Sequence, residues 1–179
     1  GGGAEVEGWT SLPCGVVTLT ERHGREDFLP EEYRSLVSDV VEMLRSFDAE
    51  HDISRHIAAG RVQMVGTAGT VTTIAGVDMC LPRYNRSKVD GAWLSFDAVA
   101  RISGELSMQN YDQRAAHPCI GHNRADLVVA GCAVLEAVCT LWPAGRLRVA
   151  DRGVREGILS VMAGQPQASC TIATASAAE

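Results

Sequence analysis

The clearest candidate for an anion-binding segment is rich in glycine and threonine and reads VGTAGTVTTIAG, at residues 65–76. Glycine lets backbone N–H groups converge and threonine adds a hydroxyl group, so such a segment can hold an anion. An ordinary strand-to-helix turn capped by threonine explains the same composition. The pattern alone favours the turn, because it matches neither the Walker nor the dinucleotide-binding fingerprint. The residues in question are Gly66, Thr67, Ala68, Gly69 and Thr70.

Two other places in the sequence have residues that can meet a phosphate group. Gly1, Gly2 and Gly3 open the chain and raise the same question as the first segment. Arg124 precedes a long apolar stretch, and a planar guanidinium can grip two phosphate oxygens. The plainer interpretation is a solvent-facing arginine, followed by Asp126 in the first turn of a helix, where its charge complements the helix dipole. The sequence leaves both interpretations open.

The loop HPCIGH brings three potential zinc ligands close together in the chain. They are His117, Cys119 and His122. A closed structural zinc site needs four ligands, and the spacing suggests no fourth. We therefore interpret these residues as parts of a loop without a metal, and we predict no metal ligand in the chain.

The segment ADRGVREGIL mixes acidic and basic residues around the start of a predicted helix. An internal Arg–Glu or Asp–Arg pairing, between residues of this segment, that fixes the last helix is the favoured interpretation. The chain shows no Ser-His-Asp or Cys-His spacing typical of a nucleophilic site, so it is assigned no catalytic residue. The charged residues of the segment are Asp151, Arg152, Arg155 and Glu156.

The composition is that of one ordinary globular domain, with 179 residues, 46% of them hydrophobic and 21% charged. A net charge of −6 argues against a general nucleic-acid surface but leaves room for local basic sites. Six scattered cysteines without a CxxC pair predict reduced thiols, and no signal peptide is found, so we expect a cytoplasmic protein. The apolar run at 127–141 is too short and too polar to span a membrane.

The order of the predicted elements indicates an α/β sheet that mixes a hairpin with parallel strands. Ligands of such sheets bind beyond the carboxyl ends of the strands, where residues 66–70 fall. The tail at 165–179 is expected to be poorly ordered. The predicted elements are two strands joined by a turn before residue 21, a helix from Pro30, a strand at 62–65, a short helix through Ile74, a connection at 79–92, a helix at 96–106 capped by Ser95, a loop, a buried helix at 125–141, a strand from Arg146 and a last helix with Asp151 near its start.

Taken together and in order, the motifs resemble the exopolyphosphatase / guanosine pentaphosphate phosphohydrolase (Ppx/GppA phosphatase) family, in its second actin-like half. The resemblance extends from residue 1 to about residue 163, which gives a domain at 1–164 and a tail at 165–179. The stretches that carry it are the three opening glycines, SLPCGVVTLTE, VGTAGTVTTIAG, HPCIGHNRADLVVAGCAVLEAV and VADRGVREGILSVM.

The resemblance implies an RNase H-like domain of the actin, sugar kinase and Hsp70 type, with a mixed sheet and helices on both faces. Family members remove the terminal phosphate of polyphosphate or the 5′ phosphate of guanosine pentaphosphate, using Mg²⁺ and an activated water. By the same resemblance, the phosphate is bound in a cleft between two halves, and the segment at 66–70 becomes an anion site rather than a plain turn. The matching residues are Gly1, Gly2, Gly3, Gly66, Thr67, Gly69, Thr70 and Arg124. Residues 66–70, which also include Ala68, are called the glycine-threonine corner below.

Three departures from the family pattern bear on activity. The aspartate that precedes the family's glycine loop lies upstream of this chain, Ala4 replaces a serine, and Val6 replaces a glutamate. Glu5 and Glu7 stand one place to either side, where strand geometry points them to the opposite face. The family's first half, which supplies the general base, is absent. We therefore expect a phosphatase parent and an inactive isolated chain.

Two other functional classes stay open. A divergent member of the family could sense phosphates or nucleotides without cleaving them, and a structural dimerisation domain is a weaker reading. The expected partners are polyphosphate or guanosine pentaphosphate, the missing N-terminal half and a second copy in a homodimer, with no nucleic acid and no membrane.

Overall fold

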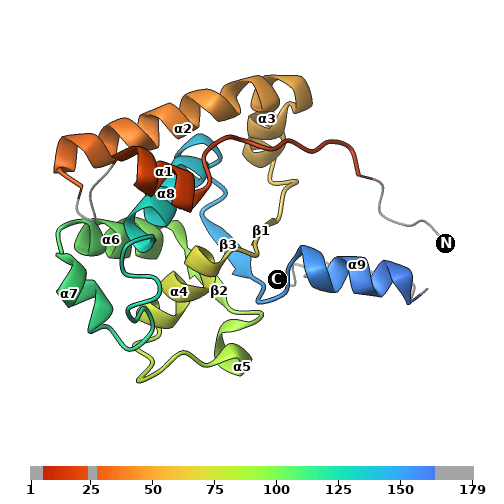
Figure 1. Cartoon of the computed structure of the whole chain (residues 1–179). Coiled ribbons are helices and arrows are strands. Elements are labelled where there is room, and N and C mark those ends of the chain that lie inside the picture. Colours follow the sequence, from red (N-terminus) through yellow and green to blue (C-terminus); the bar gives the residue numbers. More distant parts are fainter. Residues whose placement is uncertain (1–5, 24–27, 164–179) are drawn as a thin grey trace, which may run out of the picture.

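The computed structural model describes residues 6–23 and 28–163, so Gly1, Gly2 and Gly3 and the tail lie outside the described residues. Figure 1 shows helices packed around a small sheet, with the last helix projecting to one side. The elements, in chain order, are α1 (Val16–His23), α2 (Pro30–His51), α3 (Ile53–Ala58), β1 (Met64–Gly66), α4 (Gly69–Asp78), α5 (Arg86–Val89), β2 (Trp93–Ser95), α6 (Phe96–Ser107), α7 (Tyr111–Ala115), α8 (Val128–Leu141), β3 (Arg146–Val149) and α9 (Val154–Met162).

The described strands form one mixed sheet in the order β1-β3-β2. Strand β1 runs parallel to β3, and β2 runs antiparallel to it, with Leu94 opposite Leu147. The sheet is therefore mixed, as expected. Its antiparallel member is β2, a strand that the sequence analysis did not predict.

The prediction for the N-terminal segment is wrong where the structure describes it. Residues 6–15 form no strand, and the β-branched stretch that follows is the helix α1. In this helix the Thr20 hydroxyl donates to the carbonyl of Val16 at 2.9 Å, and Leu19 is buried in the core. Because α1 packs on α8, tertiary contacts outweigh the modest strand preference of its valines and threonines.

The long helices form where the sequence predicted them. Helix α2 begins at Pro30, and the side chain of Glu32 accepts a hydrogen bond from the backbone N–H of Leu29 at 2.7 Å. Helix α8 is the buried apolar helix, although it begins at Val128 rather than at residue 125. Its one charged residue, Glu136, accepts a hydrogen bond from the Tyr33 hydroxyl at 2.7 Å, so α2 supplies the partner that this carboxylate needs.

Helix α6 starts as predicted, with the Ser95 side chain accepting a hydrogen bond from the backbone N–H of Ala98 at 3.1 Å. It packs against α8 and contacts β2. The connection predicted at 79–92 holds one short helix, α5, and otherwise no regular element.

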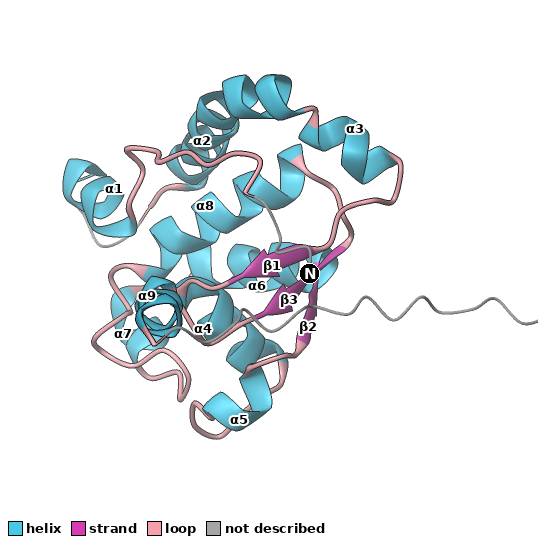
Figure 2. Cartoon of the chain, turned by 90° about the vertical axis from the view of Figure 1, so that its right-hand side faces the viewer, coloured by secondary structure: helices cyan, strands magenta, loops and turns pink. Residues whose placement is uncertain are grey.

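The two faces of the sheet differ in the described part of the chain. Leu94, Leu147 and Val149 are buried on one face, while alternate residues such as Val65 are exposed on the other. On the exposed face, the guanidinium carbons of Arg146 and Arg148 lie 4.2 Å and 5.2 Å from the centre of the Trp93 ring. Figure 2 shows α4, α6 and α8 gathered beside the strands. The buried face of the sheet therefore packs against the helices of the core, and this core positions the site.

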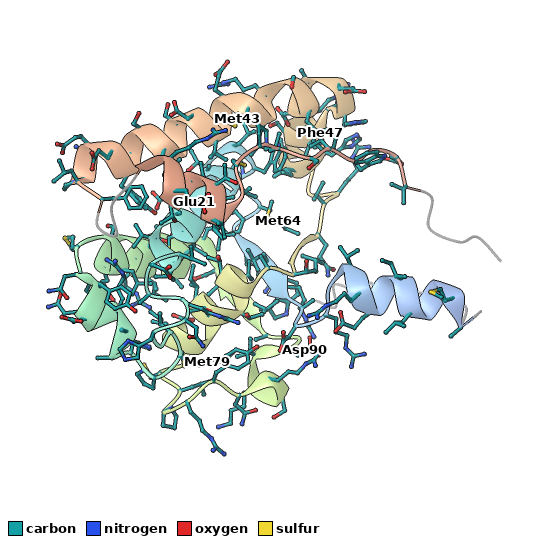
Figure 3. The ribbon with its side chains drawn as sticks, in the orientation of Figure 1. Glu21, Met43, Phe47, Met64, Met79 and Asp90 are labelled. Atoms are coloured by element: carbon teal, nitrogen blue, oxygen red, sulfur yellow. The ribbon has the colours of Figure 1, made fainter. Side chains whose placement is uncertain are left out.

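Helix α9 follows β3 after a short connection and presents apolar side chains to solvent. Asp151, just before it, donates its backbone N–H to the Asp90 carboxylate at 2.9 Å (Asp90 is labelled in Figure 3). None of the helices in the described ranges is long and apolar enough to cross a membrane.

Candidate anion-binding site

The glycine-threonine corner connects the carboxyl end of β1 to the first turn of α4. The helix has Ala68 as its N-cap, and no side chain makes a capping hydrogen bond there. Thr67, Ala68 and Gly69 are exposed. The N–H groups of the first turn have no partner within the helix, and they carry its positive end. The corner is therefore an uncapped helix N-terminus, and not the threonine-capped turn that the plainer interpretation assumed.

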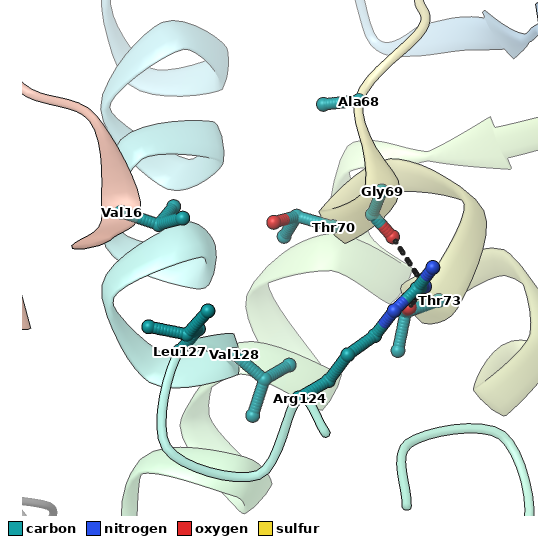
Figure 4. Close-up of a pocket in the computed structure, with 8 residues that line it drawn as sticks. All are labelled: Val16, Ala68, Gly69, Thr70, Thr73, Arg124, Leu127 and Val128. Carbon is teal, nitrogen blue, oxygen red and sulfur yellow. Dashed lines mark hydrogen bonds between the residues drawn. The ribbon is translucent and has the colours of Figure 1, made fainter.

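Arg124 reaches this helix end from the turn before α8. Its Nη1 donates to the Thr73 hydroxyl at 2.6 Å and to the carbonyl of Gly69 at 3.3 Å, across 51 and 55 residues of sequence (Figure 4). Among residues 6–23 and 28–163, no carboxylate forms a salt bridge with Arg124. The arginine and the corner, predicted separately, thus form one positively charged surface.

A pocket of about 240 Å³ lies between this surface and α8. One side is polar, with Gly69, Thr70, Thr73 and Arg124, and the other side is apolar (Figure 4). The full lining is Val16, Ala68, Gly69, Thr70, Thr73, Arg124, Leu127 and Val128. The sequence analysis missed Thr73 and the three apolar residues, because only the packing of α8 against α4 and of α1 against α8 brings them together.

The glycines around the corner serve different purposes. A Cβ on Gly66 would lie 2.9 Å from Cγ1 of Val71, so this position needs glycine for packing. A Cβ on Gly131 of α8 would lie 2.2 Å from Oγ1 of Thr70, so α8 approaches the corner at a distance that only glycine allows. The atoms nearest to a Cβ on Gly69 would be those of the Arg124 guanidinium, at an ordinary 3.8 Å.

The acidic group nearest the carboxyl end of β3 is already engaged. Asp151 accepts a hydrogen bond from the Tyr84 hydroxyl at 2.7 Å and pairs with Arg86, whose Nε lies 3.3 Å from Oδ2. Burial raises the pKa of Tyr84, and its hydrogen bond to the Asp151 carboxylate raises it further. The prediction of a pairing within the segment is therefore wrong for Asp151, whose arginine partner lies in α5. Arg152 likewise faces Asp90 at 3.8 Å, so these contacts join the segment before α9 to α5 and to the residue that follows it.

The loop HPCIGH makes its polar contacts within the protein. The backbone N–H of Cys119 donates to Nδ1 of His117 at 3.2 Å, and the Cys119 thiol faces the carbonyl of Leu81. Burial lowers the pKa of His117. His122 lies beside the Tyr111 ring. Within the described part of the chain, no three or more His, Cys, Asp or Glu residues converge to hold a metal ion.

The comparison with family models identifies this protein's family. The model of the Ppx/GppA phosphatase family matches residues 1–165. The chain belongs to the Ppx/GppA phosphatase family. A search of curated proteins found no match.

Solved structures of the same family share its fold. The chain is 23% identical to the Aquifex aeolicus PPX-GPPA enzyme, with a TM-score of 0.75. The match covers 90% of this chain and 51% of that one. It is 21% identical to an exopolyphosphatase from Cytophaga hutchinsonii, with a TM-score of 0.72 and coverage of 91% and 52%. An exopolyphosphatase-like protein is 26% identical, with a TM-score of 0.69 and coverage of 81% and 47%.

These likenesses confirm the predicted fold class. The Ppx/GppA structures have the actin-like fold, and this chain is a mixed α/β domain of that kind. The chain spans about half the length of the structures that it matches.

Proposed function

We propose that this chain is the C-terminal actin-like half of a Ppx/GppA phosphohydrolase and that its corner binds a phosphate group of inorganic polyphosphate or guanosine pentaphosphate. The observation that carries the proposal is the Arg124 guanidinium beside the uncapped N-terminus of α4. Two sources of positive charge meet there, beyond the carboxyl end of β1, where ligands of such sheets bind. The half-length coverage of the relatives supports the assignment to one half.

In this proposal the corner binds and orients but does not activate water. The first-turn N–H groups of α4 and the Arg124 guanidinium offset the charge of phosphate oxygens, which favours binding and stabilises the charge that is redistributed over the oxygens in the transition state of phosphoryl transfer. The nearby titratable groups, Tyr84 and Asp151, hold each other by a hydrogen bond. In this proposal the general base comes from the other half, as the resemblance implies. Among the described residues, no group of three or more His, Cys, Asp or Glu converges to hold the Mg²⁺ that the resemblance implies.

A phosphate-sensing module is the second candidate function. It is favoured by Ala4 and Val6, which stand where the family's glycine loop has serine and glutamate. Such a protein would keep the anion site at the corner and lose cleavage. The two candidates share the binding prediction below and differ in whether the full-length parent hydrolyses its ligand.

The first prediction concerns Arg124→Ala. Titration of the chain with tripolyphosphate at low salt should shift the amide signals of residues 66–70, and the substitution should weaken binding roughly tenfold or more, since a hydrogen bond to a charged group contributes about 1.5–3 kcal/mol. Binding should also weaken with added salt, because dissolved ions screen the charges of an exposed site.

The matched control removes the same charge elsewhere. Arg45 is exposed on α2 and pairs with Glu42 at 2.8 Å, so Arg45→Ala should change the affinity by less than about twofold if general charge is screened. If residues 66–70 do not respond, or if both variants lose the same affinity, the corner is not the binding site.

The second prediction concerns activity. The isolated chain should release no phosphate from polyphosphate or guanosine pentaphosphate with Mg²⁺ present, because the resemblance assigns the general base to the other half. Release above that of a blank without protein would contradict it. Adding the first half, expressed separately, is the complementary measurement for the enzyme hypothesis.

A further inference from the structure

Arg114 is a cation with no exposed surface, in the short helix α7 (0% exposed). Charged side chains are almost never fully buried unless they are paired or hydrogen-bonded, because the loss of hydration must be offset. Its Nε donates to the carbonyl of Ala125 at 2.7 Å, and its Nη1 donates to the carbonyl of Gln109. One buried guanidinium therefore joins the backbone on both sides of the loop that leads to α8.

The carbonyl that Arg114 holds belongs to the residue next to Arg124. The peptide at this point is also fixed by Arg124 itself, whose N–H donates to the carbonyl of Gly121 at 3.2 Å and whose carbonyl accepts from Val128 at 2.9 Å. Gly121 has a left-handed backbone, with φ of 69°, so this stretch is a tight turn rather than a helix. Without a fixed carbonyl at Ala125, the turn would lose its buried bond to α7 and keep the longer one, from the Tyr111 hydroxyl to the carbonyl of His122 at 3.3 Å.

The guanidinium suits this task better than other side chains. Its planar fork places two N–H donors in fixed directions, whereas lysine is a point charge and an apolar residue offers no donor. A buried ion pair or cation often adds little net stability compared with an apolar residue of similar size, so stability alone does not explain an arginine here. The geometry gives a further reason, because two carbonyls from separate segments converge on one group.

We propose that Arg114 is a positioning residue for the anion site: through the Ala125 carbonyl it holds Arg124 in the orientation that places its guanidinium at the N-terminus of α4. The inference rests on the proposed function, since it gives the site its second layer of support. In this proposal the affinity for the anion depends on Arg114, which does not contact the anion and lies buried behind the loop.

The test uses Arg114→Lys, which keeps the charge and removes the fork. Tripolyphosphate affinity is measured in two backgrounds, with Arg124 present and with Arg124→Ala. The substitution should weaken binding about tenfold in the first background, as for a lost second-layer contact, and less than twofold in the second. A merely structural role would change affinity equally in both backgrounds or in neither, and either result would overturn the proposal.

A second measurement needs no ligand and separates this proposal from the proposed function. The Nε–H signal of Arg124 in the free chain reports on the surroundings of its guanidinium. It should move toward the position of a freely exposed arginine in Arg114→Lys, and stay unchanged in Arg45→Ala. An unchanged signal in Arg114→Lys overturns the positioning role, whereas absence of tripolyphosphate binding by the unmodified chain overturns the proposed function.

If Arg114→Lys does not fold, Arg114→Gln is the second variant, because its amide can still donate to one of the two carbonyls. The affinity is expected to lie between those of the unmodified chain and Arg124→Ala, and the Arg124 signal between its position in the unmodified chain and that of a freely exposed arginine. Values equal to those of the unmodified chain would contradict the proposal.

Discussion

Replacement of Leu135 by alanine is expected to lower the free energy of unfolding by about 2–5 kcal/mol. Leu135 is 8% exposed in the middle of α8, the helix that packs against α2, α6 and α1. The substitution removes buried methyl groups and leaves a cavity that these three helices can close only in part. Urea unfolding followed by circular dichroism measures the loss, with the slope of the transition checked against that of the unmodified chain.

The control for Leu135→Ala is the same substitution at a leucine that solvent already reaches. Leu159 is 65% exposed on α9, so Leu159→Ala should change the free energy of unfolding by no more than about 0.5 kcal/mol. Equal losses at the two positions would show that α8 does not form the centre of the core. That result would contradict the actin-like arrangement, in which this helix lies buried against the helices beside it.

Strong local signals explain which elements the sequence predicted. Helix α2 has a proline at its start and apolar residues at helical spacing, and α6 has the serine cap, so neighbours in sequence determine both. The elements that were missed have weak or misleading local signals. Strand β2 has three residues, too few for an alternating pattern, and it forms because β3 lies alongside. Helix α1 has a β-branched sequence, and its contact with α8 decides its conformation.

The candidate site divides in the same way. Residue types alone indicated that the glycine-threonine corner and Arg124 could each meet an anion, and the structure places them together. Their contact could not be derived from the sequence, because 55 residues separate Gly69 from Arg124. The supporting residues gave no signal at all. A buried Arg114 has the same letter as an exposed arginine, and only the packed structure shows two carbonyls converging on it.

Gly131→Ala should destabilise the chain and weaken the anion site together. The added Cβ would lie 2.2 Å from Oγ1 of Thr70 and 3.1 Å from its Cβ, so the start of α4 or the helix α8 must move. Overpacking of this kind costs about 1–3 kcal/mol, which exceeds the gain from replacing a helical glycine with alanine. Because Thr70 belongs to the corner, the displacement should also reduce tripolyphosphate affinity.

The matched control is Gly104→Ala, a second glycine inside a helix. Gly104 lies in α6, and a Cβ there would have no atom within 4 Å. This variant should be more stable by about 0.5–1 kcal/mol, the usual difference between alanine and glycine within a helix, and its affinity for tripolyphosphate should stay the same. The two variants add the same methyl group, so opposite signs in stability isolate the contact between α8 and the corner. If Gly131→Ala also stabilises the chain and keeps its affinity, Thr70 can give way freely, and α8 does not hold the anion site in place.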